Sequence, residues 1–147
     1  MEIIYSYITE EDIPQISKME EKYFSQSWSE ESIKSYIDKG LVLFIVAKAE
    51  NKVVGYAATL CVLDEANLVS IAVDEDFRQM KIATEILDIV YEELKNNEIK
   101  SINLEVRESN EAARKLYEKE GFKEIGLRKN FYERPKEDAI LLERNLV

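Results

Sequence analysis

The spacing of apolar and polar residues along the chain predicts seven strands and four helices. A strand is predicted where polar and apolar residues alternate, or where a short apolar run lies between turn residues. A helix is predicted where apolar residues recur every three or four positions, as Ile82, Ile86 and Val90 do. The predicted strands cover residues 2–8, 41–49, 53–63, 67–73, 101–107, 122–132 and 138–146. The predicted helices cover residues 9–24, 29–40, 81–94 and 110–121, so the order of elements is βααβββαβαββ.

Particular residues mark where these helices begin and end. Thr9, Ser29 and Asn110 each stand at a predicted helix start, where a side-chain oxygen can accept a hydrogen bond from a free backbone amide. Glutamates follow Thr9 and Ser29 directly, and negative charge in a first turn interacts favourably with the helix dipole. Gly40 is expected to end the second helix, because glycine readily adopts the left-handed conformation of a helix C-terminus.

Length and composition fit one folded domain that spans residues 1–147. Hydrophobic residues make up 46% of the chain and charged residues 34%, which is typical neither of a disordered chain nor of a membrane-embedded one. The longest apolar run, residues 41–47, is far shorter than the roughly 20 residues that a membrane-spanning helix needs. The N-terminus has neither the basic flank nor the long apolar stretch of a secretory signal. We therefore expect a cytoplasmic protein that does not bind membranes.

The net charge and the lack of histidine limit the kinds of partner and of catalytic site that the protein could have. Twenty basic residues against thirty acidic ones give a net charge of −10, which argues against direct nucleic-acid binding and favours a basic partner. With no histidine and one cysteine, Cys61, the sequence contains no Cys/His metal site, no Ser-His-Asp triad and no internal disulfide. Cys61 lies in an apolar strand with no histidine to activate it, so a cysteine nucleophile is disfavoured. Catalysis must use carboxylates, tyrosines, lysines, hydroxyls or backbone dipoles.

Residues 71–84 join a predicted strand to the third predicted helix and could bind an anion. The free amides and the dipole of a helix N-terminus favour negative charge, and Arg78 and Lys81 add two cations to an otherwise acidic protein. A pyrophosphate group would fit such a site. The alternative is an ordinary strand-to-helix loop with two solvated cations.

A second group of candidates follows in the next strand and helix. Glu105 lies in an otherwise apolar strand. If the strand face that carries it is partly shielded from solvent, its carboxylate could act as a general base. If that face is exposed to solvent, Glu105 would be a solvated residue or a partner of Arg107. Tyr117 has a phenolic proton that suits donation to a thiolate leaving group, although core packing is the simpler reading of a lone tyrosine. Asn110 is by default an N-cap whose amide could also contact a ligand.

Several short motifs occur in a fixed order along the chain. They are Trp28-Ser29-Glu30, Leu63-Asp64-Glu65-Ala66 with Ile71-Ala72-Val73-Asp74, Leu104-Glu105-Val106-Arg107 with Ser109-Asn110, Leu116-Tyr117 with Gly121-Phe122, and residues 128–132 followed by Glu137-Asp138-Ala139. In this combination the chain resembles the GNAT superfamily of acetyl-CoA-dependent N-acetyltransferases over essentially its whole length. The resemblance implies an α/β (α+β) fold, with a central mixed, mostly antiparallel sheet of seven strands flanked by four helices. It also implies acetyl-CoA as co-substrate and no metal.

The resemblance also implies roles for individual residues. Glu105 matches the family's proton acceptor, Tyr117 its proton donor and Asn110 a coenzyme contact. The pantetheine arm of acetyl-CoA would lie along the backbone of Ile71, Ala72 and Val73. The pyrophosphate would be held by Arg78, Gln79, Met80, Lys81, Ile82, Ala83 and Thr84.

Two positions depart from the family's pattern. The family's pyrophosphate loop usually reads Gln/Arg-x-x-Gly-x-Gly/Ala, and Lys81 stands at the first glycine. If that position needs a positive φ, a side chain there costs energy; if it does not, the lysine could contact phosphate oxygens. Phe131 stands where the family often has tyrosine, which removes one hydroxyl contact to a peptide substrate.

The resemblance also indicates the kind of acceptor. The motifs are most similar to those of enzymes that acetylate the N-terminal alanine of a small-subunit ribosomal protein, which implies a basic protein N-terminus as partner. Between Thr9 and Glu31, seven acidic residues and two lysines could steer such a tail, or could form a solvated helix face. Trp28 could be a lid aromatic or a core anchor. Two alternatives stay open: a GNAT enzyme that acts on lysine side chains or small amines, and a CoA-binding module with weakened catalysis.

Overall fold

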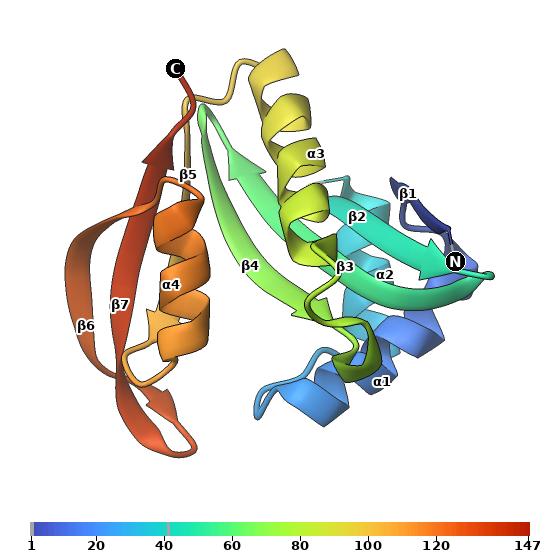
Figure 1. The fold of residues 1–147 in the computed structure, drawn as a ribbon, viewed down its shortest axis with the longest axis horizontal. Coiled ribbons are helices and arrows are strands. Elements are labelled where there is room, and N and C mark those ends of the chain that lie inside the picture. The colour runs from blue at the N-terminus through green and yellow to red at the C-terminus, as the bar shows by residue number, and fades with distance from the viewer. Residues whose placement is uncertain (1, 41) are drawn as a thin grey trace.

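A computed structural model describes residues 2–40 and 42–147 (Figure 1). In these residues, helices and strands follow one another in the order that the hydrophobic pattern predicts. The strands are β1 (Ile3–Tyr7), β2 (Val42–Ala49), β3 (Lys52–Val62), β4 (Glu65–Val73), β5 (Ser101–Arg107), β6 (Lys123–Glu133) and β7 (Lys136–Asn145). The helices are α1 (Ile13–Tyr23), α2 (Glu30–Lys39), α3 (Ile82–Asn96) and α4 (Glu111–Lys119), with short 3₁₀ turns η1 (Glu10–Asp12) and η2 (Glu75–Phe77). Leu41, the predicted first residue of the second strand, lies outside the described residues.

The strands form one mixed sheet in the order β1-β2-β3-β4-β5-β7-β6, which confirms the predicted fold class. All neighbouring strands run antiparallel except β4 and β5, which are parallel. These two strands pair only where residues 65–67 face residues 101–103, and beyond that point they diverge (Figure 1). The part of β4 that follows residue 67 therefore has one edge without a partner strand in the described residues.

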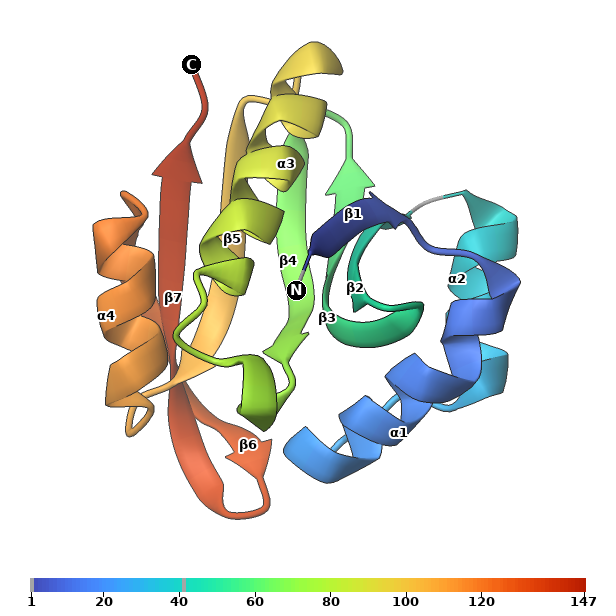
Figure 2. The same cartoon turned by 45° about the vertical axis from the view of Figure 1, so that its right-hand side comes forward.

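The two faces of the sheet are covered by different helices (Figure 2). The core beneath α3 and α4 includes Ile86, Val90, Ile102 and Tyr117. The second core lies beneath α1 and α2 and includes residues from β2, β3 and both helices. Successive β2 residues alternate between the two cores, as expected for a strand that is covered on both faces.

Gly55 in β3 allows the start of α3 to lie close to the sheet. A Cβ atom at this position would lie 3.2 Å from the carbonyl oxygen of Ala72 and 3.3 Å from side-chain atoms of Ile82 and Ile86. Ile82 is the first residue of α3 and is only 2% exposed. This close packing holds the N-terminus of α3 beside the end of β4.

The first predicted helix divides into a 3₁₀ turn and α1. Pro14 lacks a backbone N–H and is tolerated only in the first turn of a helix, so the α-helix begins at Ile13 rather than at residue 10. Thr9 still marks the start of the helical segment, because its backbone N–H donates to the Asp12 carboxylate at 2.8 Å.

The helix ends predicted at Ser29, Asn110 and Gly40 are confirmed. The Ser29 hydroxyl accepts from the Ser32 amide at 3.1 Å, and Asn110 Oδ1 accepts from the Ala113 amide at 3.2 Å. Gly40 follows α2 with a φ of 65°.

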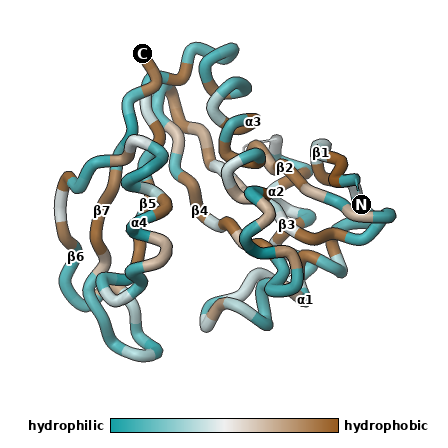
Figure 3. The backbone as a smooth tube through the Cα atoms, in the orientation of Figure 1, coloured by the Kyte–Doolittle hydropathy of each residue, from teal (hydrophilic) through white to brown (hydrophobic). Residues whose placement is uncertain are grey.

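Figure 3 shows hydrophobic residues along central strands such as β4 and β7, whereas the tip of the β6–β7 hairpin is mainly hydrophilic. Among the described residues, no helix has the length and apolar character needed to cross a membrane.

Candidate active site

The loop between β4 and α3 is held in place by side chains of its own and of α1. The Tyr23 hydroxyl accepts a hydrogen bond from the Glu75 amide at 2.9 Å. Arg78 Nε donates to the carbonyl oxygen of Val73 at 3.1 Å, and its guanidinium lies 4.9 Å from the centre of the Tyr23 ring. These contacts fix Arg78 at the point where β4 ends.

Lys81 adopts a left-handed backbone conformation immediately before α3. Its φ is 62° and its ψ is 20°, and Gln79 also has a positive φ of 67°. For a residue with a side chain this conformation costs about 1 kcal/mol relative to glycine. The position that is glycine in the family's loop therefore does require a positive φ here, and Lys81 is strained.

The N-terminus of α3 offers free amides next to these cations. Glu85 donates its amide to the carbonyl oxygen of Lys81 at 3.0 Å, which is the first hydrogen bond of the helix. The amides of Ile82, Ala83 and Thr84 precede that bond and have no intrahelical acceptor. They are suited to binding phosphate oxygens.

A cleft of about 760 Å³ lies between this loop and α4. Seven predicted coenzyme contacts line the cleft, namely Val73, Arg78, Gln79, Lys81, Ile82, Ala83 and Thr84. The fit of these residues to a pyrophosphate is good, because free amides, a helix dipole and two cations meet at one surface.

Four predicted coenzyme contacts do not line this cleft. Ala72 is buried in the core beneath α1, and Ile71 packs against the core beneath α3. Met80 is 46% exposed on the loop, and Asn110 serves as the N-cap of α4. A backbone contact from Ile71 or Ala72 could be made only along the open edge of β4.

The wall formed by α4 was not predicted from the sequence. Ala112, Lys115, Leu116 and Lys119 line the cleft, together with Glu118. Their three- and four-residue spacing places most of them on one helix face, which was the available signal. What the spacing could not reveal is that this face lies opposite the loop that precedes α3.

Glu105 and Tyr117, the predicted proton acceptor and donor, lie outside the lining of the cleft. Glu105 is half-buried, on the strand face opposite Leu104 and Val106, which are both in the core beneath α3. Tyr117 is 6% exposed and packs edge-on against Phe122, with 5.5 Å between ring centres. Burial raises the pKa of Tyr117, and nearby Tyr132 raises this pKa further.

Tyr132, near the end of β6, was not predicted as a site residue. Burial raises the pKa of Tyr132, and the negative charge of Glu105 adds to the rise in pKa. Tyr132 thus lies near both Glu105 and Tyr117. Phe131 is 44% exposed and packs edge-on against the Tyr132 ring, with 5.1 Å between centres.

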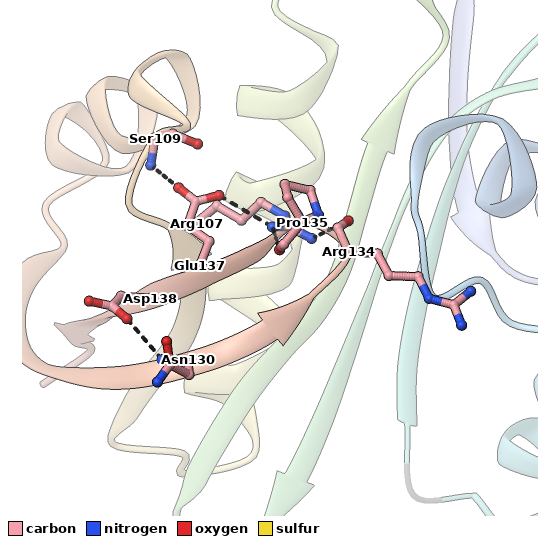
Figure 4. A network of polar contacts seen from close by, with 7 residues as sticks. All are labelled: Arg107, Ser109, Asn130, Arg134, Pro135, Glu137 and Asp138. Carbon is pink, nitrogen blue, oxygen red and sulfur yellow. Dashed lines mark hydrogen bonds and ion pairs between the residues drawn. The ribbon is translucent and has the colours of Figure 1, made fainter.

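Arg107 fixes the β6–β7 hairpin that carries Tyr132 (Figure 4). Its guanidinium donates to the carbonyl oxygens of Pro135 and Arg134, at 2.9 Å and 3.0 Å. The same group lies 4.3 Å from the centre of the Tyr132 ring. Since Arg107 belongs to β5, it links this hairpin to the strand that contains Glu105.

Glu137 completes this network (Figure 4). Its carboxylate accepts from Arg107 Nη1 at 3.2 Å and from the Ser109 amide at 2.6 Å. Its hydrogen bonds with Ser109, followed by Arg107, lower the pKa of the Glu137 carboxyl below its usual value. The hairpin is therefore connected both to β5 and to the segment before α4.

Glu20 on α1 is a buried carboxylate that the sequence analysis did not single out. It is 2% exposed and accepts three hydrogen bonds, from the Tyr56 hydroxyl at 2.5 Å, the Ser70 hydroxyl at 2.7 Å and the Trp28 amide at 3.2 Å. Glu20 follows Ile13 and Ile16 at helical spacing, and that position on the buried face was the available signal.

The predicted acidic surface of residues 9–31 needs correction, because two of its seven acidic residues are buried. Glu20 is one, and Asp12, which is 1% exposed, pairs with Lys48 at 2.7 Å. A carboxylate enclosed in the protein interacts with its own partners, so these two do not contribute to a solvated acidic face. The other five acidic residues are exposed, and Glu10 among them pairs with Lys34 at 2.8 Å.

Trp28 lies between α1 and α2 and packs against both aromatic and polar neighbours. Its ring centre lies 5.2 Å from that of Tyr36 and 6.3 Å from that of Phe44. Its carbonyl oxygen accepts from the Ser17 hydroxyl at 3.1 Å, and its amide donates to Glu20. Trp28 is thus partly buried and packs against the core beneath α1 and α2, which favours the anchoring role.

Burial raises the pKa of the Cys61 thiol, which leaves less of the reactive thiolate at neutral pH. This agrees with the expectation that cysteine is not the nucleophile.

Comparison with known proteins defines the class to which this site belongs. Residues 8–133 match the family model of the acetyltransferase (GNAT) domain, so the chain belongs to the GNAT acetyltransferase family. The family resemblance seen in the sequence motifs is thereby confirmed.

Within this family, the chain is similar to enzymes that carry one particular name. The ribosomal protein bS18-alanine N-acetyltransferase of Escherichia coli (strain K12) is 35% identical over 133 residues, which cover 89% of each protein. The protein of the same name from Haemophilus influenzae is 32% identical over 147 residues, covering 95% of this chain and 96% of the relative. The crystal structure of the Escherichia coli ribosomal-protein-S18-alanine N-acetyltransferase matches with a TM-score of 0.89 at 32% identity, over 99% of this chain and 94% of that one.

Proposed function

We propose that this protein transfers an acetyl group from acetyl-CoA to the α-amine of an N-terminal alanine, and that ribosomal protein bS18 is its acceptor. The similarity to bS18-alanine N-acetyltransferases over almost the whole chain supports the acceptor. The observation that carries the donor assignment is the cleft at the start of α3, where free amides and two cations meet in a protein of net charge −10.

Glu105 is the proposed proton acceptor. An α-amine has a reference pKa of about 8, so much of it is protonated at neutral pH and must lose a proton before it can attack a thioester. The half-buried carboxylate lies beyond the point where β4 and β5 diverge, on the face away from the α3 core. It would accept the proton through a water molecule.

Tyr117 is the proposed proton donor. Bound acetyl-CoA supplies the reactive carbonyl, and the leaving group is a thiolate. The hydroxyl of Tyr117 is protonated at neutral pH, because the reference pKa of tyrosine is about 10 and burial raises the pKa further, so a proton is present when the thiolate departs. Backbone amide at the open edge of β4, near Val73, would stabilise the negative charge that develops on the carbonyl oxygen.

A panel of short peptides tests the proposal. The peptides begin with Ala, Ser or Met, or carry a blocked N-terminus, and each continues with several Arg or Lys residues. Transfer is measured by CoA release and by mass spectrometry. We expect the Ala peptide to be acetylated fastest and the blocked peptide not at all. Transfer to small amines alone, or acetyl-CoA binding without any transfer, would contradict the proposal and favour the alternatives named above.

A further inference from the structure

Two pairs of cations line opposite walls of the cleft. Arg78 and Lys81 belong to the loop before α3, and Lys115 and Lys119 belong to α4. Glu118 is the sole acidic residue among the described residues that line the cleft. This local excess of positive charge contrasts with the net charge of −10 of the whole chain.

Among the described residues, these four cations form no ion pairs. The ion pairs among residues 2–40 and 42–147 involve Lys22, Lys34, Lys48, Lys100 and Arg107. Acidic residues outnumber basic ones by thirty to twenty, so cations free of carboxylate partners in one cleft are available for an anionic ligand.

The two walls differ in the kind of anion site that they provide. The loop wall supplies the amides and the positive dipole end of α3, which suit a pyrophosphate. The α4 wall supplies side chains only, since Lys115 lies at the middle of the helix and Lys119 is its last residue, away from the free amides of its N-terminus. An anion at this wall must therefore depend on the lysine charges themselves.

Coenzyme A carries two separate phosphate groups, the pyrophosphate and a 3′-phosphate on its ribose. We propose that Lys115 and Lys119, one helical turn apart, form a second phosphate subsite that binds the 3′-phosphate while the loop binds the pyrophosphate. This inference rests on the proposed function. Lysine suits a phosphomonoester, because it acts as a compact point charge and does not require a planar partner.

Titration calorimetry with CoA and with 3′-dephospho-CoA tests the subsite. We expect Lys115→Ala and Lys119→Ala each to weaken CoA binding about two- to fivefold, the upper part of the range for an exposed charge pair. Binding of 3′-dephospho-CoA should change by less than about twofold, because the lysines then have no phosphate to contact. Lys39→Ala, which removes an exposed lysine on α2, is the matched control and should leave both affinities unchanged.

The outcomes separate this inference from the proposed function. An equal loss of affinity for both ligands, or no loss for either, would overturn the α4 subsite while leaving coenzyme binding established. Failure of the wild-type protein to bind either ligand would contradict the proposed function and the subsite together. Circular dichroism of the variants shows that a loss of affinity is not a loss of fold.

Discussion

Two carboxylates on the sheet face opposite α3 lie in contrasting surroundings. Glu20 is 2% exposed and accepts hydrogen bonds from α1–α2, β3 and β4 residues, so its oxygens are fully engaged. Glu105 is half-buried at the diverging end of β5 and lies near Tyr132. A buried carboxylate whose oxygens all accept hydrogen bonds stabilises the folded protein. A partly accessible carboxylate beside an opening in the sheet is able to accept a proton from a substrate.

Of the substitutions considered for these two carboxylates, Glu105→Gln should have the largest effect, and that effect should be on the rate of acetyl transfer. The amide keeps the shape of the side chain and cannot accept a proton, so we expect acetyl transfer to slow by about 10²- to 10⁴-fold. The relative loss should be greatest at low pH, where more of the amine is protonated. Coenzyme affinity should stay nearly unchanged. Initial rates across the pH range measure the effect, and Glu108→Gln, an exposed neighbour, is the control. Wild-type turnover at every pH would remove Glu105 from the mechanism.

Glu20→Gln should act on stability instead. Three donors point at the carboxylate, and the NH₂ group of glutamine would face one of them, so we expect unfolding to become easier by about 1–3 kcal/mol. Urea denaturation measures this change. Glu21→Gln alters the adjacent exposed residue and should change stability by less than about 0.5 kcal/mol. Equal stability of the two variants would mean that the buried hydrogen bonds contribute little.

Tyr56 allows a pH test of the same buried cluster. Burial raises the pKa of Tyr56 above its usual value, and nearby Glu20 raises this pKa further. The folded protein therefore holds this proton more tightly than the unfolded chain does. The resulting stabilisation is complete below the unfolded pKa of about 10 and is lost as the pH rises above it. Tyr56→Phe should make the alkaline decline in stability shallower, by up to about 1.4 kcal/mol per pH unit. An identical decline in both proteins between pH 10 and 11 would contradict this.

The smallest expected effects concern the loop before α3. Lys81→Gly relieves the left-handed strain and should raise the free energy of unfolding by about 0.5–1 kcal/mol. It also removes a cation from the cleft, so CoA affinity should fall about threefold. Gln79→Gly relieves a similar conformation without removing a charge, and should raise stability while affecting affinity less. Tighter CoA binding by Lys81→Gly would show that the lysine hinders the coenzyme rather than contacting it.

The order of helices and strands was predictable from the sequence because periodicity is a local property. The divergence of β4 and β5 was not, because it depends on pairing between segments that are far apart in the chain. The positive φ at Lys81 was one of two possibilities that the family's loop pattern left open, and the lysine itself did not distinguish them. Lys115 and Lys119 were not predicted to line the cleft, because that depends on α4 lying opposite the loop before α3.

Burial of charged residues was the least predictable feature. Glu20 and Asp12 were counted with their acidic neighbours as one surface, since a residue's formal charge says nothing about which helix face it occupies. Their partners, Tyr56, Ser70 and Lys48, lie on strands tens of residues away, and only the fold brings them together. By contrast, Glu105 and Tyr117 were identified by matching short motifs, and their roles stay predictions.

The most direct test of the account is one acceptor that offers both kinds of amine. A peptide that begins with alanine and continues with several lysines is incubated with acetyl-CoA and the protein, and tandem mass spectrometry locates the added acetyl group. The α-amine loses its proton at a pH roughly two units lower than a lysine side chain, so a carboxylate base activates it more readily. We expect acetylation of the N-terminal alanine alone, and no product once that amine is blocked. Undiminished acetylation of the internal lysines in the blocked peptide would contradict the account.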